Sequence, residues 1–181
     1  MKAVILAGGL GTRLKDVCEN VPKPLTKLCE KPVLEHQIEA LKAEGITDFI
    51  LILGHLSEQI QAYFGDGKSF GVNISYYVEE TPLGTAGALF KLGLNDDFLL
   101  CNGDSIFNFS LSAMVAFHKE KNALATLLTH PNSHPFDSTL FLTDGDKITG
   151  LLPKENKPFS YCNLCNSGIA VISPKLLDLY S

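Results

Sequence analysis

The sequence predicts an α/β protein built on a doubly wound, mostly parallel sheet, and three observations lead to this prediction. Short apolar runs that read as strands alternate with stretches in which apolar residues have helical spacing. The run at 98–101 is apolar throughout, as in a central strand that a parallel sheet buries on both faces. The first strand, at 3–6, leads directly into a loop that contains Gly8, Gly9 and Gly11, and such strand ends carry the ligand sites of α/β sheets.

The elements after this loop follow in order from local signals. A helix is expected over Val33–Ala43, because Leu34, Ile38 and Leu41 share one face and Gly45 ends it. Ser57 and Ser110 are expected to cap two further helices, the second of which runs to about Lys121. The remaining elements of this part are strands at 48–53, 72–78, 98–101 and 123–129 and a helix at 85–92.

The rhythm changes in the last third of the chain. Segments 138–142 and 148–152 flank the turn Asp144-Gly145-Asp146 and predict a β-hairpin. A strand at 166–172 follows, and Ser173-Pro174 begins a last helix. The sequence therefore predicts a small β insertion beside the main sheet.

Composition restricts the class of protein. The 181 residues suit a single domain, and 45% apolar with 19% charged residues is typical of a soluble globular protein. The net charge of −5 argues against a nucleic-acid partner. No run has the length of a membrane span and the N-terminus lacks the layout of a signal peptide, so we expect a cytoplasmic protein with no membrane partner. A homo-oligomer or a fusion to a further C-terminal segment stays open.

The five cysteines are expected to be thiols. Cys162 and Cys165 have the spacing of half a zinc site, but no second ligand pair has a suitable spacing, so structural zinc is not expected.

The glycine loop predicts a binding site for a polyphosphate. Consecutive exposed backbone amides form a concavity that binds anions, and Arg13 adds a cation whose planar fork suits phosphate. No Gly-Lys-Ser/Thr closes the loop as in a P-loop, and Leu14 stands where a dinucleotide fingerprint has its last glycine. Lys23, held between Pro22 and Pro24 in a stiff loop, is expected to be a second phosphate cation beside the glycine loop, whereas taken alone it would be an ordinary surface lysine. A turn without a ligand is the alternative interpretation of the glycines alone.

Several ordered blocks of the chain resemble the sugar-1-phosphate nucleotidyltransferases, also called NDP-sugar pyrophosphorylases. They lie at 6–14, 22–25, 80–87, 98–104 and 166–169 and cover nearly the whole chain. The resemblance is greatest to the mannose-1-phosphate and D-glycero-D-manno-heptose-1-phosphate guanylyltransferases. It implies a Rossmann-like fold of the nucleotide-diphospho-sugar transferase type, with residues 1–181 as one nucleotidyltransferase domain that lacks its C-terminal part.

The resemblance also implies a reaction and its residues. A sugar-1-phosphate attacks the α-phosphorus of a nucleoside triphosphate, and pyrophosphate leaves. The implied catalytic residues are Arg13, Lys23 and Asp104, with Asp104 as the protein ligand of Mg²⁺. The implied nucleotide-binding residues are Leu6, Ala7, Gly8, Gly9, Gly11, Thr12, Arg13, Glu80, Pro82, Leu83, Gly84, Thr85, Asn102 and Gly103.

On the sugar side, the resemblance implies that Lys154, Asn166 and Gly168 bind the sugar phosphate. Two departures from the family pattern stand out. The family usually has a Glu-Lys pair before the strand at 166, where this chain has Pro153 and Lys154. The family also commonly holds the metal with a second aspartate close to the C-terminus, and this chain stops at Ser181 before that block.

The identity of the nucleotide depends on Glu80. A carboxylate accepts hydrogen bonds from guanine N1–H and the 2-amino group together, which favours GTP unless Glu80 is simply a solvated charge. A uridylyl-, cytidylyl- or thymidylyltransferase, acting on a sugar-1-phosphate or on phosphocholine, is the nearest alternative. A non-catalytic regulatory domain of the same fold and a molybdopterin guanylyltransferase are the others.

Overall fold

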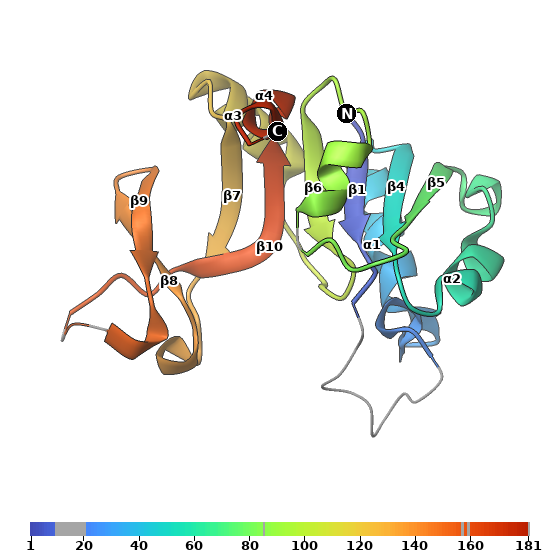
Figure 1. Ribbon diagram of the computed structural model, residues 1–181, viewed down its shortest axis with the longest axis horizontal. Helices are drawn as coiled ribbons and strands as arrows, with labels where there is room; N and C mark the ends of the chain where they lie inside the picture. The colour runs from blue at the N-terminus through green and yellow to red at the C-terminus, as the bar shows by residue number, and fades with distance from the viewer. Residues whose placement is uncertain (10–20, 85, 157, 159, 181) are drawn as a thin grey trace. The chain divides into compact units, whose positions relative to one another are not determined.

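The computed structural model describes residues 1–9, 21–84, 86–156, 158 and 160–180 (Figure 1). The chain divides into two compact units. The first comprises Met1–Thr126 and Ala170–Ser181, and the second comprises Leu127–Ile169.

The main sheet has the strand order β5-β4-β1-β6-β10-β7. β1 (Ala3–Leu6) lies between β4 (Asp48–Leu53) and β6 (Phe98–Asn102), and β5 (Asn73–Val78) lies beyond β4. These three pairings are parallel, and Figure 1 shows the four strands side by side. Because β1 pairs only with strands distant in sequence, each connection crosses over the sheet, as in a doubly wound fold. The predicted fold class is confirmed.

The register of these strands brings their carboxyl ends to one edge. Leu6, the last residue of β1, stands opposite Ile52 of β4 and Asn102 of β6. Beyond the end of β5, the backbone N–H of Glu79 donates to the carbonyl of Leu53 at 2.8 Å. Four chain segments therefore leave the first unit's sheet at the same edge.

Helix α1 (Val33–Ala43) has the bounds that its apolar spacing predicts. Leu34, Ile38 and Leu41 are fully or almost fully buried, and Gly45 follows the helix with φ +91°. A second buried cluster in this unit contains Val4, Ile52, Ala88, Leu89, Phe98 and Ile172. The core of the first unit thus lies on both faces of its sheet and does not cover the edge formed by the carboxyl ends of the strands.

Two of the predicted helix features are wrong. Ser57 is the first residue of α2 (Ser57–Phe64), and Leu56 occupies the N-cap position in a left-handed conformation without any side-chain cap. The helix predicted at 85–92 is a 3₁₀ helix at Gly87–Lys91. Gly84 and Gly93, which lie before and after this segment, both have positive φ.

Helix α3 (Leu111–Glu120) begins behind Ser110 as predicted, and the Ser110 hydroxyl accepts a hydrogen bond from the Ala113 N–H at 3.3 Å. The other elements of the first unit are β2 (Lys27–Leu28), β3 (Lys31–Pro32), α4 (Pro174–Asp178) and 3₁₀ helices at Lys23–Leu25 and Lys68–Phe70. Within the described part of the chain, no helix is long and apolar enough to span a bilayer.

The second unit contains the predicted β-hairpin. β8 (Leu140–Asp144) pairs antiparallel with β9 (Lys147–Leu152), and Gly145 makes the turn at φ +55°. A small core of Leu140, Leu152 and Cys165 packs against Tyr161. Strands β7 (Ala125–His130) and β10 (Cys165–Ile172) run from one unit into the other, and 3₁₀ helices occupy Pro135–Asp137 and Lys154–Asn156.

Candidate nucleotide-binding site

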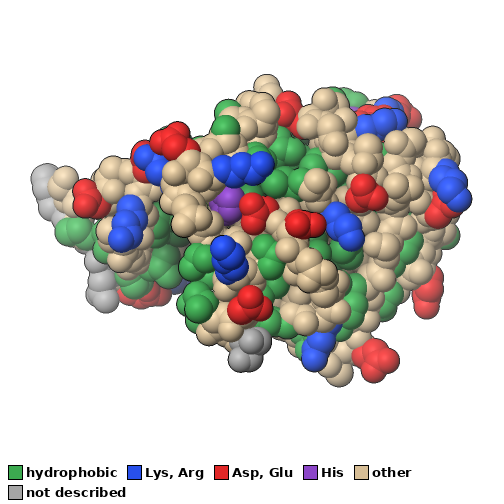
Figure 2. Space-filling model, turned by 90° about the horizontal axis from the view of Figure 1, so that it is seen from above, with side chains coloured by type: hydrophobic (Ala, Val, Ile, Leu, Met, Phe, Trp, Pro, Cys, Tyr) green, Lys and Arg blue, Asp and Glu red, His purple; other side chains and the backbone are tan. Residues whose placement is uncertain are grey.

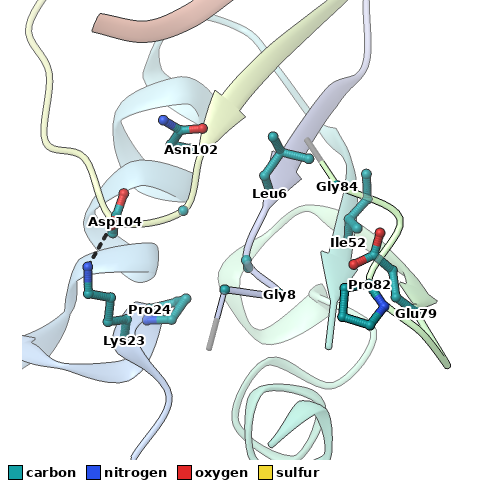
Figure 3. A pocket seen from close by; sticks show the side chains of 13 residues that line it. Leu6, Gly8, Lys23, Pro24, Ile52, Glu79, Pro82, Gly84, Asn102 and Asp104 are labelled. Carbon is teal, nitrogen blue, oxygen red and sulfur yellow. Dashed lines mark hydrogen bonds and ion pairs between the residues drawn. The ribbon is translucent and has the colours of Figure 1, made fainter. Parts of the chain in front are cut away.

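A cavity of about 420 Å³ opens at the carboxyl edge of the first unit's sheet. This edge is where open α/β sheets bind their ligands. Figure 3 shows two ends of the cavity, with the loop after β1 between them. The lining residues are Leu6, Ala7, Gly8, Gly9, Lys23, Pro24, Ile52, Glu79, Pro82, Gly84, Asn102, Gly103 and Asp104.

One end of the cavity is charged. The Lys23 Nζ lies 3.2 Å from the Asp104 Oδ2, as the dashed line in Figure 3 marks. Lys23 lies between Pro22 and Pro24 and is the first residue of the 3₁₀ helix Lys23–Leu25. The two prolines restrict the backbone on either side of it, as the sequence predicts. Asp104 follows the end of β6 by two residues. The local fold therefore presents a cation and a carboxylate together at the cavity.

Glycines bring the three strand ends close together at the centre of the cavity. A Cβ on Gly54, just after β4, would lie 2.7 Å from the carbonyl oxygen of Gly8. A Cβ on Gly103, just after β6, would lie 3.0 Å from the carbonyl oxygen of Leu6. The loop after β1 is thus held between two neighbouring loops at distances that side chains would prevent.

The opposite end of the cavity combines apolar groups with one carboxylate. Ile52, Pro82 and Gly84 lie around Glu79 in Figure 3. The Glu79 Oε1 is buried and has no hydrogen-bond partner among the described residues. A buried carboxylate oxygen without a donor is costly, so this oxygen is suited to accept hydrogen bonds from a ligand.

Most of the predicted nucleotide-binding residues that the structure describes line this cavity, together with the predicted catalytic residues Lys23 and Asp104. They are Leu6, Ala7, Gly8, Gly9, Lys23, Pro82, Gly84, Asn102, Gly103 and Asp104. Glu80 and Leu83 are exposed and are not among the lining residues. Glu79 directly follows β5 and lines the cavity, whereas the chain bends at Glu80, so the carboxylate in the cavity is that of Glu79. Gly11, Thr12, Arg13 and Thr85 lie outside the described residues.

The predicted sugar-phosphate residues belong to the second unit. Lys154 is exposed in its 3₁₀ helix. The Asn166 Oδ1 accepts a hydrogen bond from the Gly168 N–H at 2.9 Å, and Gly168 has φ +78°. Asn166 and Gly168 are therefore joined by a local hydrogen bond within β10.

Sequence reasoning missed Ile52, Gly54 and Glu79. Ile52 is the last residue but one of a strand that the sequence predicts at 48–53, and Gly54 and Glu79 directly follow the strands predicted at 48–53 and 72–78. Because the carboxyl ends of parallel strands share one edge, the residues at these two ends could have been included as candidates.

Cys101 lies directly before Asn102 in β6. Burial raises the pKa of its thiol to about 12, which disfavours the reactive thiolate at neutral pH. No group of three or more His, Cys, Asp or Glu side chains that could hold a metal occurs among the residues described.

The fold and the cavity define an α/β protein with a candidate ligand site at the carboxyl edge of its sheet. The chain belongs to the nucleotidyl transferase family, whose model matches residues 2–141. It is 37% identical to mannose-1-phosphate guanyltransferase beta-A of Xenopus laevis, over 98% of this chain and 51% of that protein. It is 32% identical to UTP–glucose-1-phosphate uridylyltransferase of Synechocystis sp., over 98% of this chain and 50% of that protein.

Solved structures show the same relationship. A putative glucose-1-phosphate thymidylyltransferase from Bacillus anthracis superposes with a TM-score of 0.85 at 28% identity, over 98% of this chain and 73% of that one. HddC from Yersinia pseudotuberculosis superposes with a TM-score of 0.80 at 25% identity, over 99% and 79%. The chain spans about half the length of the curated relatives it matches.

Proposed function

We propose that the protein transfers a nucleotidyl group from a nucleoside triphosphate, with GTP preferred, to a sugar-1-phosphate. The observation that carries the proposal is a single cavity with the Lys23–Asp104 pair at one end and the unpartnered oxygen of Glu79 at the other. The charged end suits a triphosphate, the apolar end suits a base, and the glycine loop lies between them.

In the proposed reaction, one phosphoanhydride bond of the nucleoside triphosphate breaks and a new one forms to the sugar phosphate. An oxygen of the sugar phosphate forms a bond to the α-phosphorus, the bond to the β-phosphate bridging oxygen breaks, and pyrophosphate leaves with the electron pair. The backbone at Gly8 and Gly9 lets the phosphates approach closely. Lys23 neutralises negative charge at the α-phosphate, and Arg13 is proposed to hold the departing pyrophosphate. This chemistry depends on position and charge and needs no covalent nucleophile.

The residues at the charged end fit Mg²⁺. Asp104 already has a cation, the Lys23 ammonium, on its Oδ2 at 3.2 Å. Mg²⁺ commonly uses one or two carboxylates together with substrate phosphates, which matches one aspartate beside a phosphate loop. When bound, the metal would supply charge neutralisation on the phosphate oxygens. Asp104 would hold it there, and Lys23 would move from the carboxylate to the phosphate.

The preference for GTP rests on Glu79. Guanine presents two adjacent donors, N1–H and the 2-amino group, whereas uracil and thymine present one donor between two acceptors. A carboxylate with a free, buried oxygen therefore matches guanine better than the pyrimidines. The relatives include guanylyl-, uridylyl- and thymidylyltransferases, so their names support the reaction but favour no single donor.

For the acceptor we propose a hexose- or heptose-1-phosphate. Lys154, Asn166 and Gly168 of the second unit are the residues proposed to bind it. The Asn166 amide nitrogen can donate to a sugar hydroxyl while its oxygen holds the Gly168 N–H.

A panel assay tests the proposal. GTP, ATP, CTP, UTP and dTTP are each combined with several sugar-1-phosphates and Mg²⁺, and pyrophosphate release is measured. Release that depends on a sugar-1-phosphate and is fastest with GTP is the expected result. Faster release with UTP or dTTP would move the chain to the uridylyl or thymidylyl branch. Release with no pair would contradict the proposed activity and favour a non-catalytic domain of this fold.

A further inference from the structure

Gln37 is a polar residue on the buried face of α1. Its side chain is only 2% exposed, next to the fully buried Ile38. The Gln37 Nε2 donates to the carbonyl of Asn102 at 2.8 Å and also to the carbonyl of Ser105. One side chain from α1 therefore ties down the loop that follows β6.

The two carbonyls lie on either side of Asp104. Asn102 ends β6, and Ser105 is the residue directly after Asp104. On the opposite side of the loop, the Gly103 N–H donates to the Leu6 carbonyl at 2.9 Å. The backbone that carries the Asp104 carboxylate is thus fixed between the first strand and the first helix.

This arrangement has a cost that packing alone does not explain. Both amide hydrogens of Gln37 are used by the loop, but the Gln37 Oε1 is buried without a hydrogen-bond partner among the described residues. An apolar side chain of similar length would fill the same space and leave no such oxygen. The amide nitrogen of Gln37 supplies two hydrogen bonds that an apolar side chain cannot make, to the backbone carbonyls of Asn102 and Ser105 before and after Asp104.

We propose that Gln37 is a positioning residue that holds the Asp104 carboxylate where it meets the divalent ion and the triphosphate. The inference rests on the proposed function, because it assigns the ion to Asp104. Gln37 touches neither ligand and acts through the backbone of the Asn102–Ser105 loop. Partners that orient a metal ligand in this way commonly change metal affinity or activity by about 10- to 100-fold when they are removed.

The experiment compares three variants of the full chain. Gln37→Leu and Gln37→Glu both keep the side chain's approximate size, and neither provides the two N–H donors at neutral pH. Ile38→Val is the matched control, because it removes one methyl group from the neighbouring buried position of α1 and leaves the loop contacts intact. Two Gln37 variants are used so that one remains if the other fails to fold, which circular dichroism monitors.

Two measurements are made on each folded variant. Hydrogen exchange of the Gly103 amide, followed by NMR in the free protein, reports the loop without any ligand. Binding of Mn²⁺ in the presence of GTP, without a sugar phosphate, is read from the EPR signal of free Mn²⁺, and kcat and KM for GTP are determined separately.

For both Gln37 variants we expect faster Gly103 exchange, Mn²⁺ affinity weakened about tenfold or more, and a fall in kcat with little change in KM for GTP. Ile38→Val should match the wild type in all of these. Gln37 variants that match Ile38→Val in Mn²⁺ affinity and Gly103 exchange would overturn the inference. If the wild type itself binds no Mn²⁺ with GTP, the proposed function fails, and the exchange measurement still decides whether Gln37 holds the loop.

Discussion

At the scale of single residues, the ion pair between Lys23 and Asp104 contributes little to the stability of the fold. Their side chains are 29% and 49% exposed, and a pair this open to solvent contributes only about 0–1 kcal/mol to folding. Stability is therefore a weak reason for the two charges to meet. The small energy also means that the pair separates easily when a phosphate attracts Lys23 and a divalent ion attracts Asp104.

Asp104→Asn should abolish Mg²⁺-dependent turnover while folding stays intact. The amide cannot neutralise a divalent ion, and loss of the exposed pair should lower the free energy of unfolding by less than about 1 kcal/mol. Pyrophosphate release across a Mg²⁺ titration and a urea melt measure the two effects. Turnover close to that of the wild type would contradict the assignment of Asp104 as the residue that holds Mg²⁺.

Glu79 and Glu80 form a matched pair for testing nucleotide preference. Glu79→Gln replaces one acceptor by a donor in front of two guanine donors, so kcat/KM for GTP should fall about 10- to 100-fold. The values for UTP and dTTP should fall less or rise. Glu80→Gln changes an exposed carboxylate and should leave the GTP preference within about twofold. A large loss of GTP preference in Glu80→Gln and none in Glu79→Gln would assign the base contact to Glu80, as the sequence alone suggests.

The thiols should differ sharply in reactivity. With a pKa of about 12, Cys101 has only about one thiolate in ten thousand molecules at pH 8, and its side chain is fully buried. Cys29 and Cys162 are exposed. Alkylation at pH 8 followed by peptide mass spectrometry should label Cys29 and Cys162 first, and Cys101 only after unfolding. Labelling of Cys101 at the rate of Cys29 would show that β6 opens in the native protein.

At the scale of elements, the strand ends are held together by the absence of side chains. Gly54→Ala would place a Cβ 2.7 Å from the Gly8 carbonyl oxygen, so the loop after β1 or the end of β4 must move. We expect a loss of about 1–3 kcal/mol in stability together with weaker nucleotide binding. Gly9→Ala is the control for stability, because its Cβ would meet no atom of the described residues within 4 Å. Thermal melts of both variants measure the difference, and equal melting temperatures would count against a close contact.

The elements also show what the sequence can and cannot predict. Leu34, Ile38 and Leu41 determine α1 to the residue, since their spacing and Gly45 are local signals. Local signals do not decide whether Glu79 or Glu80 faces the cavity, because this depends on how the chain is oriented as it leaves β5. That orientation is decided by the hydrogen bond from Glu79 to Leu53 of a neighbouring strand, which no local pattern contains.

The same limit applies to Gln37 and Gly54. The sequence places Gln37 beside the apolar stripe of a helix, but its partners are 65 and 68 positions away along the chain. Gly54 matters only because Gly8 lies against it. Motif resemblance finds residues that touch a ligand, whereas residues that hold those residues in place emerge only when distant segments are brought together.

At the scale of the whole molecule, one edge of the sheet supplies the entire cavity. Every lining residue that the structure describes belongs to the first unit. The lining comes from the ends of β1, β4 and β6, from the segments after β1, β5 and β6, and from Lys23 and Pro24. Figure 2 shows acidic and basic side chains interspersed over one face, without one sign dominating that view. With a net charge of −5, the protein has no general attraction for an anionic nucleotide. The proposed affinity for GTP therefore has to come from the local groups of the cavity.

A nucleotide bound at this edge should stabilise the whole first unit, because it would contact residues at or just after the ends of β1, β4, β5 and β6 together. A ligand at 100 times its Kd adds about 2.7 kcal/mol, which corresponds to a rise in Tm of roughly 5–10 °C for a chain of this size. Differential scanning fluorimetry with GTP and Mg²⁺ measures the shift. Asp104→Asn should lose the part that depends on Mg²⁺, and Glu79→Gln should lose the excess of GTP over UTP. Hydrogen exchange should slow at the carboxyl ends of β1, β4 and β6, where the chain leaves the sheet. An unchanged Tm at millimolar GTP with Mg²⁺ would mean that this edge does not bind nucleotide, whatever the family of the chain.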